Sequence, residues 1–210
     1  MALSARRPSA LTELLVASRN LKKLAELNRV LAHAGVSGLR LVSLADVAPY
    51  DETPETGATF EDNALAKARD GFTATGLACV ADDSGLTVSA LNGMPGVLSA
   101  RWSGVHGDDA ANTALVLAQL RDVPDERRGA AFVSACALVS AAGEVVVRGE
   151  WRGSIAREPH GDGGFGYDPV FIPDGRDQTA AQLSPADKDA ESHRGRALLL
   201  LIPALRSLAR

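Results

Sequence analysis

The sequence predicts an α/β protein of the mixed α+β class. Strand-like and helix-like segments alternate through the first part of the chain, and two long β-patterned segments then follow, separated by A-A-G. Alternation is typical of parallel strands joined by helices, whereas close β-patterned neighbours form antiparallel hairpins. At 210 residues the chain is long enough to bury one sizeable core.

Each element is assigned from apolar spacing and from its boundary residues. Residues 20–34 place apolar side chains at helical intervals, and Gly35 lies where a helix C-cap is expected. Pro203 lies inside the last helical pattern, where it can introduce a kink. The expected elements are, in order, a strand at 11–18, a helix at 20–34, a strand at 39–44, a polar loop at 49–57, a helix at 59–73, a strand at 77–83, a loop at 91–107, a helix at 108–120, a hairpin of 130–140 with 144–155, a glycine-rich loop at 161–169 and a helix at 192–208.

Composition excludes several classes of protein. A net charge of −4 and 4% aromatic residues argue against a broad nucleic-acid-binding face, which needs clustered Lys and Arg. No apolar stretch approaches the length that spans a bilayer. Cys79 and Cys136 lie in apolar runs and are interpreted as small buried hydrophobes. We therefore expect a cytoplasmic protein without nucleic-acid or membrane partners, with residues 1–10 as a frayed tail.

The first strand-to-helix turn, A-S-R-N-L-K-K at 17–23, has the features of a phosphate site. Ser18 is a candidate N-cap, and the free N–H groups of a helix start attract anions. Lys22 and Lys23 oppose the helix dipole there, a cost that a bound phosphate would offset. The alternative is a plain cap with two solvated lysines, and no Walker A motif is present.

Asp82 and Asp83 are the candidate acids. They end an apolar strand and precede Ser84-Gly85, which we interpret as a turn that brings the acids to one site. Mg²⁺ typically takes one or two protein carboxylates together with waters and substrate phosphates, and Glu55 is a possible second acid. The alternative is an Asp-Ser turn with solvated acids.

The loop G-D-G-G-F-G-Y-D-P at 161–169 and the helix start S-H-R-G at 192–195 complete the candidate site. Glycine lets backbone approach a flat ligand closely, and Phe165 is able to stack on a base. His193 and Arg194 are candidate hydrogen-bond donors. A ligand-free hairpin and a capping histidine are the alternatives, but the combination of these features favours a nucleotide site.

Together, six motifs resemble the inosine triphosphate pyrophosphatase family over roughly Leu14 to Leu208. In the family's order they are S-R-N-L-K-K, E-T-G-A-T-F-E-D-N-A-L-A-K-A, A-D-D-S-G-L, G-M-P-G-V-L-S-A-R-W-S-G, G-G-F-G-Y-D-P and S-H-R-G-R-A-L. The resemblance implies Mg²⁺-dependent hydrolysis of ITP, dITP or XTP to the monophosphate and pyrophosphate. It also implies a homodimer, with residues 11–210 as one catalytic domain whose elongated mixed sheet lies between two α/β lobes.

The resemblance also implies roles for individual residues. Asp83 would activate water and, with Glu55, hold Mg²⁺. The residues implied in substrate binding are Ser18, Arg19, Asn20, Leu21, Lys22 and Lys23 with Lys67 at the phosphates, Ser84 as a further substrate contact, and Phe165, Gly166, Tyr167, Asp168, Lys188, His193 and Arg194 around the base. The family often has glycine where this chain has Arg19 and Lys22, so the phosphate segment is less flexible and more positive here. Asp82 is expected to support the site.

Base selection has a physical interpretation. Inosine and xanthosine carry a 6-oxo acceptor, and adenine carries an amino donor at the same place. Donors such as His193 and Arg194 would meet that amino group unfavourably, at about 1–3 kcal/mol for each buried mismatch. Two rival functions are a pyrophosphatase for pyrimidine or methylated nucleotides and a catalytically silent nucleotide-binding module.

Overall fold

The computed structural model describes residues 11–209, so the expected tail at 1–10 lies outside the described residues. The helices are α1 (Leu21–His33), α2 (Phe60–Thr75), α3 (Asp109–Gln119), α4 (Pro185–Glu191) and α5 (His193–Leu208). The strands are β1 (Thr12–Val16), β2 (Leu39–Ser43), β3 (Ala78–Val88), β4 (Gly129–Ser140), β5 (Gly143–Ile155) and β6 (Phe171–Pro173). No helix among residues 11–209 is long and apolar enough to cross a membrane.

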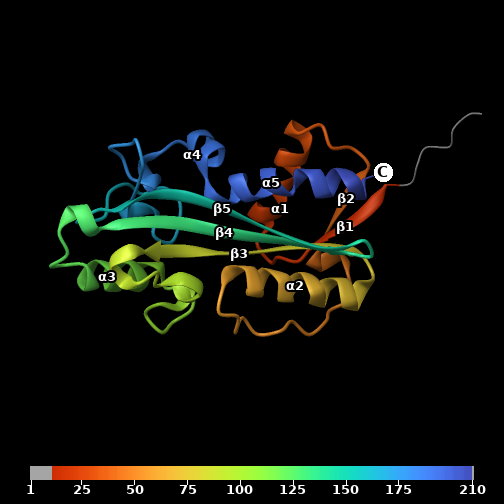
Figure 1. The fold of residues 1–210 in the computed structure, drawn as a ribbon, viewed down its shortest axis with the longest axis horizontal. Coiled ribbons are helices and arrows are strands. Elements are labelled where there is room, and N and C mark those ends of the chain that lie inside the picture. Colours follow the sequence, from red (N-terminus) through yellow and green to blue (C-terminus); the bar gives the residue numbers. More distant parts are fainter. Residues whose placement is uncertain (1–10, 210) are drawn as a thin grey trace, which may run out of the picture.

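Within residues 11–209 the strands form one six-stranded sheet in the order β2-β1-β3-β4-β5-β6. β1 runs parallel to β2 and β3, whereas the β3–β4, β4–β5 and β5–β6 pairs are antiparallel. This mixed sheet confirms the predicted fold class, and the expected hairpin is the β4–β5 pair. The long strands β3, β4 and β5 give the molecule its elongated shape (Figure 1).

Helices cover both faces of the sheet. Figure 1 shows α2 and α3 below the sheet and α1, α4 and α5 above it. Below, the apolar side of α2 packs on small residues of β4, with Ala64 and Ala68 against Ala135 and Ala137. Above, α1 and α5 share a larger cluster that includes Leu27 and Leu201. Because both faces are buried, the strands are rich in apolar residues on both sides.

The predicted end of the third strand is wrong. β3 does not stop at the two aspartates but continues to Val88, and Ser84-Gly85 lies within the strand rather than in a turn. Gly85 has a packing role, because a Cβ there would lie 2.3 Å from Ser99 Oγ and 2.7 Å from Gly96 O. The glycine therefore allows the 3₁₀ segment Gly96–Arg101 to pack directly on the strand.

Several helix boundaries also differ from the prediction. Asn20, not Ser18, is the N-cap of α1, because its side chain accepts the Lys22 N–H at 3.0 Å. The expected loop at 91–107 contains the 3₁₀ segment Gly96–Arg101, and the short helix α4 was not expected. Pro203 lies within α5 without ending it. Gly35 follows α1 with φ +62°, as a residue just beyond a helix often does.

Candidate active site

β1 leaves part of the β3 edge uncovered where the two aspartates lie. β1 ends at Val16 and pairs only with Ala78–Val80 of β3. Neighbouring residues of a strand point to opposite faces, and an open edge makes both faces accessible from one side. Lys67 occupies this edge, because its Nζ lies 3.3 Å from the main-chain oxygen of Asp82, which points along the plane of the sheet.

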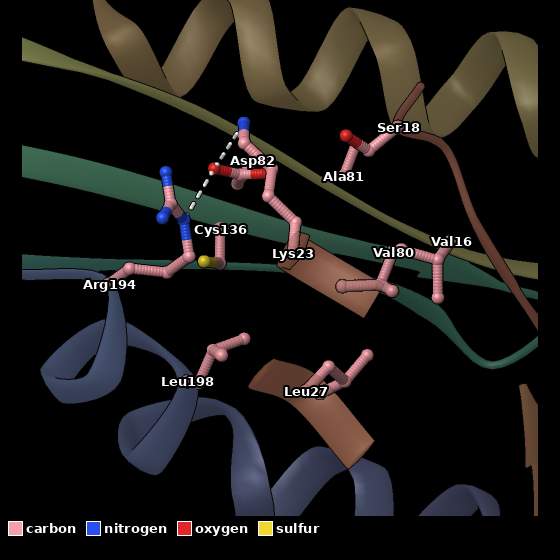
Figure 2. Close-up of a pocket in the computed structure, with 10 residues that line it drawn as sticks. All are labelled: Val16, Ser18, Lys23, Leu27, Val80, Ala81, Asp82, Cys136, Arg194 and Leu198. Atoms are coloured by element: carbon pink, nitrogen blue, oxygen red, sulfur yellow. Dashed lines mark hydrogen bonds and ion pairs between the residues drawn. The ribbon is translucent and has the colours of Figure 1, made fainter. Parts of the chain in front are cut away.

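Asp82 lies on the α1 and α5 face, between two cations. Its Oδ2 is 2.8 Å from Lys23 Nζ and 3.2 Å from Arg194 Nε, and Figure 2 shows both side chains turned toward it. Arg194 also donates to Ser84 Oγ at 3.3 Å and pairs with Glu26 at 3.4 Å. Burial disfavours the Asp82 carboxylate, but the charges of Lys23 and Arg194 outweigh it and hold the pKa of Asp82 well below its usual value.

Asp83 lies on the α2 face and has a different environment. It is 8% exposed, its Oδ2 accepts a hydrogen bond from Asn63 Nδ2 at 2.9 Å, and its Oδ1 is 3.6 Å from Lys67 Nζ. Burial raises the pKa of Asp83, and Lys67 and Asn63 offset only part of that effect. The pKa of Lys67 is also raised, because Asp83 and Glu55 outweigh the desolvation of its ammonium.

Glu55 joins the Asp83 group through the same lysine. Its carboxylate contacts Lys67 Nζ and lies 3.5 Å from Arg101 Nη1, while its main-chain oxygen accepts from Arg101 Nη2 at 3.1 Å. Burial opposes its ionisation, but Lys67 and Arg101 lower the pKa of Glu55 overall. A charged carboxylate is thus maintained beside Asp83.

The donor set of Glu55 and Asp83 fits a magnesium ion. Both carboxylates converge on one cationic atom, Lys67 Nζ, so their charges are concentrated around a single position. Two carboxylates are a typical protein share of a Mg²⁺ shell that substrate phosphates and waters complete. Among residues 11–209 no group of three or more His, Cys, Asp or Glu side chains forms a fuller metal site.

A cavity of about 660 Å³ adjoins Ser84 and Gly85 and extends to the glycine-rich loop. Two contacts fix the conformation of this loop. The Phe165 N–H donates to Asp168 Oδ2 at 2.7 Å, and that carboxylate also pairs with Lys188. Phe165 is 56% exposed, and Lys188 Nζ lies 5.0 Å from the centroid of its ring. This volume and an accessible aromatic face suit a flat ligand.

His193 lines the same cavity from the start of α5. Its ring stacks on Phe132 at 5.1 Å, and its Nδ1 is buried without a hydrogen-bond partner among the described residues. Burial, with the nearby charges of Arg194 and Lys188, lowers the pKa of His193 well below its usual value. A neutral imidazole carries one N–H and one acceptor nitrogen, and the hydrogen-bonding capacity of the buried Nδ1 is not filled by the described residues.

The structure brings most of the predicted site residues together, but not all. Ser18 lines the small pocket of Figure 2 with Lys23, and Lys22 lines the larger cavity. Arg19 extends outward to an exposed ion pair with Glu52. Leu21 is 70% exposed. Lys23 is thus not the solvated lysine of the alternative interpretation, and Asp82 and Asp83 are not solvated turn acids.

Sequence reasoning missed several residues that this geometry includes. Asn63 links Asp83 to the Glu55 loop, because its Oδ1 accepts the Gly57 N–H at 2.8 Å. Arg101 binds Glu55, and Asp109 Oδ2 accepts the Gly166 N–H at 2.7 Å. Asn63 and Arg101 lie inside motifs that carried the family resemblance, which was the available signal. Nothing in the sequence distinguished Asp109 from a helix-start acid.

Known proteins match this chain over almost its whole length. The Ham1 family model matches residues 14–204. The dITP/XTP pyrophosphatase of Mycobacterium tuberculosis strain H37Rv is 82% identical over 198 residues, which cover 94% of this chain and 97% of that protein. The dITP/XTP pyrophosphatase of Nocardia farcinica is 75% identical over 200 residues, which cover 95% and 97%.

Solved structures agree with these matches. The crystal structure of the nucleoside-triphosphatase / dITP/XTP pyrophosphatase from Mycobacterium abscessus has a TM-score of 0.80 at 72% identity, covering 92% of this chain and 100% of that one. The Ham1 protein of Staphylococcus aureus has a TM-score of 0.85 at 35% identity, covering 93% and 99%. They confirm the fold class, and with the family match they show that the chain belongs to the Ham1 family.

Proposed function

We propose that this protein hydrolyses nucleoside triphosphates with 6-oxopurine bases, dITP, XTP and ITP, to the monophosphate and pyrophosphate. One observation carries the proposal: cations and acids on both faces of β3 meet at its open edge, beside a cavity lined by the Phe165 loop. Relatives that are 75–82% identical carry the name dITP/XTP pyrophosphatase. Phosphate chemistry and base selection are thereby assigned to adjoining parts of one cleft.

Phosphate binding falls to the cations at the β3 edge. Lys23 and Arg194 reach this edge from one face and Lys67 from the other. A triphosphate between them would meet positive charge on both sides and the positive end of the α1 helix dipole. These groups stabilise the negative charge that shifts to the leaving pyrophosphate as the bond breaks.

Water activation falls to Asp83. In the metal-free protein burial raises the pKa of Asp83, and Asn63 fixes its Oδ2 by a hydrogen bond. Asp83 Oδ1 is directed toward the Lys67 side, where it accepts a proton from the attacking water. The water oxygen then bonds to the α-phosphorus, and the bond from that phosphorus to the bridging oxygen of the pyrophosphate breaks. The nucleoside monophosphate and pyrophosphate are released.

Glu55 and Asp83 would hold the magnesium ion. Mg²⁺ supplies charge neutralisation of the phosphates and polarisation of a phosphoryl oxygen when it is bound. Lys67, which contacts both acids, would exchange one carboxylate contact for a phosphate oxygen. In the metal-free protein the pKa of Lys67 is raised by Asp83 and Glu55, so its ammonium is charged before substrate binds.

Base selection falls to the Phe165 loop and the start of α5. Phe165 offers a stacking face, and His193 and Arg194 line the cavity with polar groups. Arg194 and Lys188 line the cavity and carry only hydrogen-bond donors, so they suit the 6-oxo edge of hypoxanthine or xanthine better than the amino group of adenine.

Three further expectations remain predictions for this chain: a homodimer, a cytoplasmic location, and the absence of nucleic-acid or membrane partners. The division of residues 11–210 into two lobes of one catalytic domain is also a prediction. Gel filtration with light scattering tests the dimer directly.

A substrate panel tests the proposed function. Pyrophosphate release is measured on ITP, dITP, XTP, dTTP and ATP, with and without Mg²⁺. We expect Mg²⁺-dependent release from the three 6-oxopurine substrates and much slower release from ATP and dTTP. Fast release from dTTP would instead support the pyrimidine rival, and no release from any nucleotide would support the silent binding module.

A further inference from the structure

One short segment contacts both the base loop and the Glu55 loop of the candidate site. The 3₁₀ segment Gly96–Arg101 packs on β3 at Gly85, accepts a hydrogen bond from Tyr167 of the base loop, and ends at Arg101, which binds Glu55. We propose that this segment couples base binding to the placement of Glu55, with Ser99, Arg101 and Tyr167 as positioning residues. The inference rests on the proposed base site.

The contact with the base loop is a buried hydrogen bond. Tyr167 is 4% exposed, and its hydroxyl donates to the main-chain oxygen of Ser99 at 2.8 Å. Tyr167 follows Phe165 and Gly166 in the loop that lines the cavity. A base that binds to this loop therefore contacts residues that the Tyr167 side chain connects to the segment Gly96–Arg101.

The contact with β3 leaves little slack. Ser99 Oγ accepts the Leu86 N–H at 2.8 Å and lies 2.6 Å from Gly96 O. The segment approaches the strand so closely that a Cβ on Gly85 would overlap Ser99 Oγ. Close packing of this kind transmits displacement instead of absorbing it.

The contact with Glu55 comes two residues later. Arg101 donates to the main-chain oxygen of Glu55 and pairs with its carboxylate, so it fixes both the backbone and the side chain. Asn112 of α3 steadies the same stretch, since its Oδ1 accepts the Ser103 N–H at 2.7 Å. A movement of the segment is therefore passed to Glu55 rather than to solvent.

Hydrogen–deuterium exchange tests the coupling without turnover or metal. Inosine monophosphate is added to the wild-type protein in the absence of Mg²⁺, and exchange is followed in the peptides spanning 51–58, 96–101 and 161–169. We expect exchange to slow in all three, by about fivefold or more at 51–58. Ribose 5-phosphate, which carries a phosphate but no base, should leave 51–58 unchanged.

Two variants cut the route at different points. In Tyr167→Phe, inosine monophosphate should still slow exchange at 161–169 but no longer at 51–58. In Arg101→Gln, protection should persist at 96–101 and disappear at 51–58. Thr113→Val is the matched control, because the Thr113 hydroxyl donates to Gly166 O of the base loop at 3.4 Å and is not one of the three proposed positioning residues; it should retain protection at 51–58. Unchanged exchange in the β4–β5 peptides confirms that each variant is folded.

Protection at 51–58 that survives both Tyr167→Phe and Arg101→Gln would overturn the inference, as would equal protection by ribose 5-phosphate. The assay is independent of the pyrophosphate panel. A failed panel with intact coupling would contradict only the proposed activity, and a successful panel without coupling would contradict only the inference.

Discussion

Asp82 and Asp83 are neighbours in sequence but occupy opposite chemical environments. Asp82 lies between Lys23 and Arg194, and these cations depress its pKa. Asp83 is buried beside Asn63 and a more distant Lys67, and burial raises its pKa. The pleat of one strand thus separates a carboxylate that organises cations from one that is able to accept a proton.

The largest expected effect is a fall in kcat when Asp83, the acid proposed to accept a proton from water, is replaced. Asp83→Asn keeps the shape of the side chain but cannot accept a proton from water, so kcat should fall by about 10²–10⁴. Nucleotide affinity should remain measurable, since Lys23 and Arg194 are untouched. Steady-state kinetics and equilibrium binding of dITP check this. Near-normal kcat would contradict the role given to Asp83.

For folding stability we expect the reverse order: the Asp82 variant should lose more unfolding free energy than the Asp83 variant. Asp82→Asn leaves Lys23 without its carboxylate and leaves Arg194 with Glu26 and the Ser84 hydroxyl, which should cost about 3 kcal/mol of unfolding free energy. That loss corresponds to a Tm decrease of about 6–12 °C for a chain of this size. Asp83→Asn removes a desolvated carboxylate and should leave the unfolding free energy equal or higher. Urea unfolding of both variants tests the contrast, and equal losses would contradict it.

In the metal-free protein, the pH dependence of the unfolding free energy should also distinguish Asp82 from Asp83. The folded pKa of Asp82 lies below the ordinary value of 3.8, so its stabilisation is present above that value and is lost as pH falls through the folded pKa. The folded pKa of Asp83 lies above 3.8, so its cost is complete above the raised pKa and disappears as pH falls below 3.8.

The stability difference between Asp82→Asn and Asp83→Asn should therefore be largest near about pH 7 and narrow toward about pH 3. Chemical unfolding of the two variants across this range measures the difference. A gap that stays constant or widens on acidification would show that the two pKa directions are wrong.

The smallest effect is expected at Arg19. Its side chain is 84% exposed and its ion pair with Glu52 is at the surface, whereas Lys23 is turned inward to Asp82. Arg19→Ala should raise KM for dITP by less than about threefold, and Lys23→Ala by about tenfold or more, as expected for loss of a charged hydrogen bond. A larger KM effect at Arg19 would place the triphosphate nearer to the exposed side of the α1 turn.

Local periodicity predicted most of the fold. The helical spacing at 20–34 and 59–73 and the paired β patterns at 130–155 correspond to α1, α2 and the β4–β5 hairpin. Gly85 shows the limit of such reasoning. Ser-Gly after two acids is typical of a turn, but here the glycine is needed inside a strand because Gly96–Arg101 packs on it. That packing partner is not visible in the local sequence.

The site was predictable in composition but not in pairing. The motifs contained Lys23, Lys67, Arg194 and both aspartates, yet nothing local assigns Arg194 to Asp82 across 112 residues, or Lys67 to Glu55 and Asp83. Those partners are set by the order of strands in the sheet. The different pKa directions of the two acids follow from that order and could not be inferred beforehand.

Identifying which phosphoanhydride bond of the substrate is broken tests the proposed activity most directly. ³¹P NMR of dITP turnover with Mg²⁺, on wild type and on Asp83→Asn, identifies the phosphorus products. We expect equal amounts of pyrophosphate and deoxyinosine monophosphate from the wild type, at a rate that Asp83→Asn largely abolishes. Orthophosphate with deoxyinosine diphosphate, or undiminished pyrophosphate production by Asp83→Asn, would contradict it.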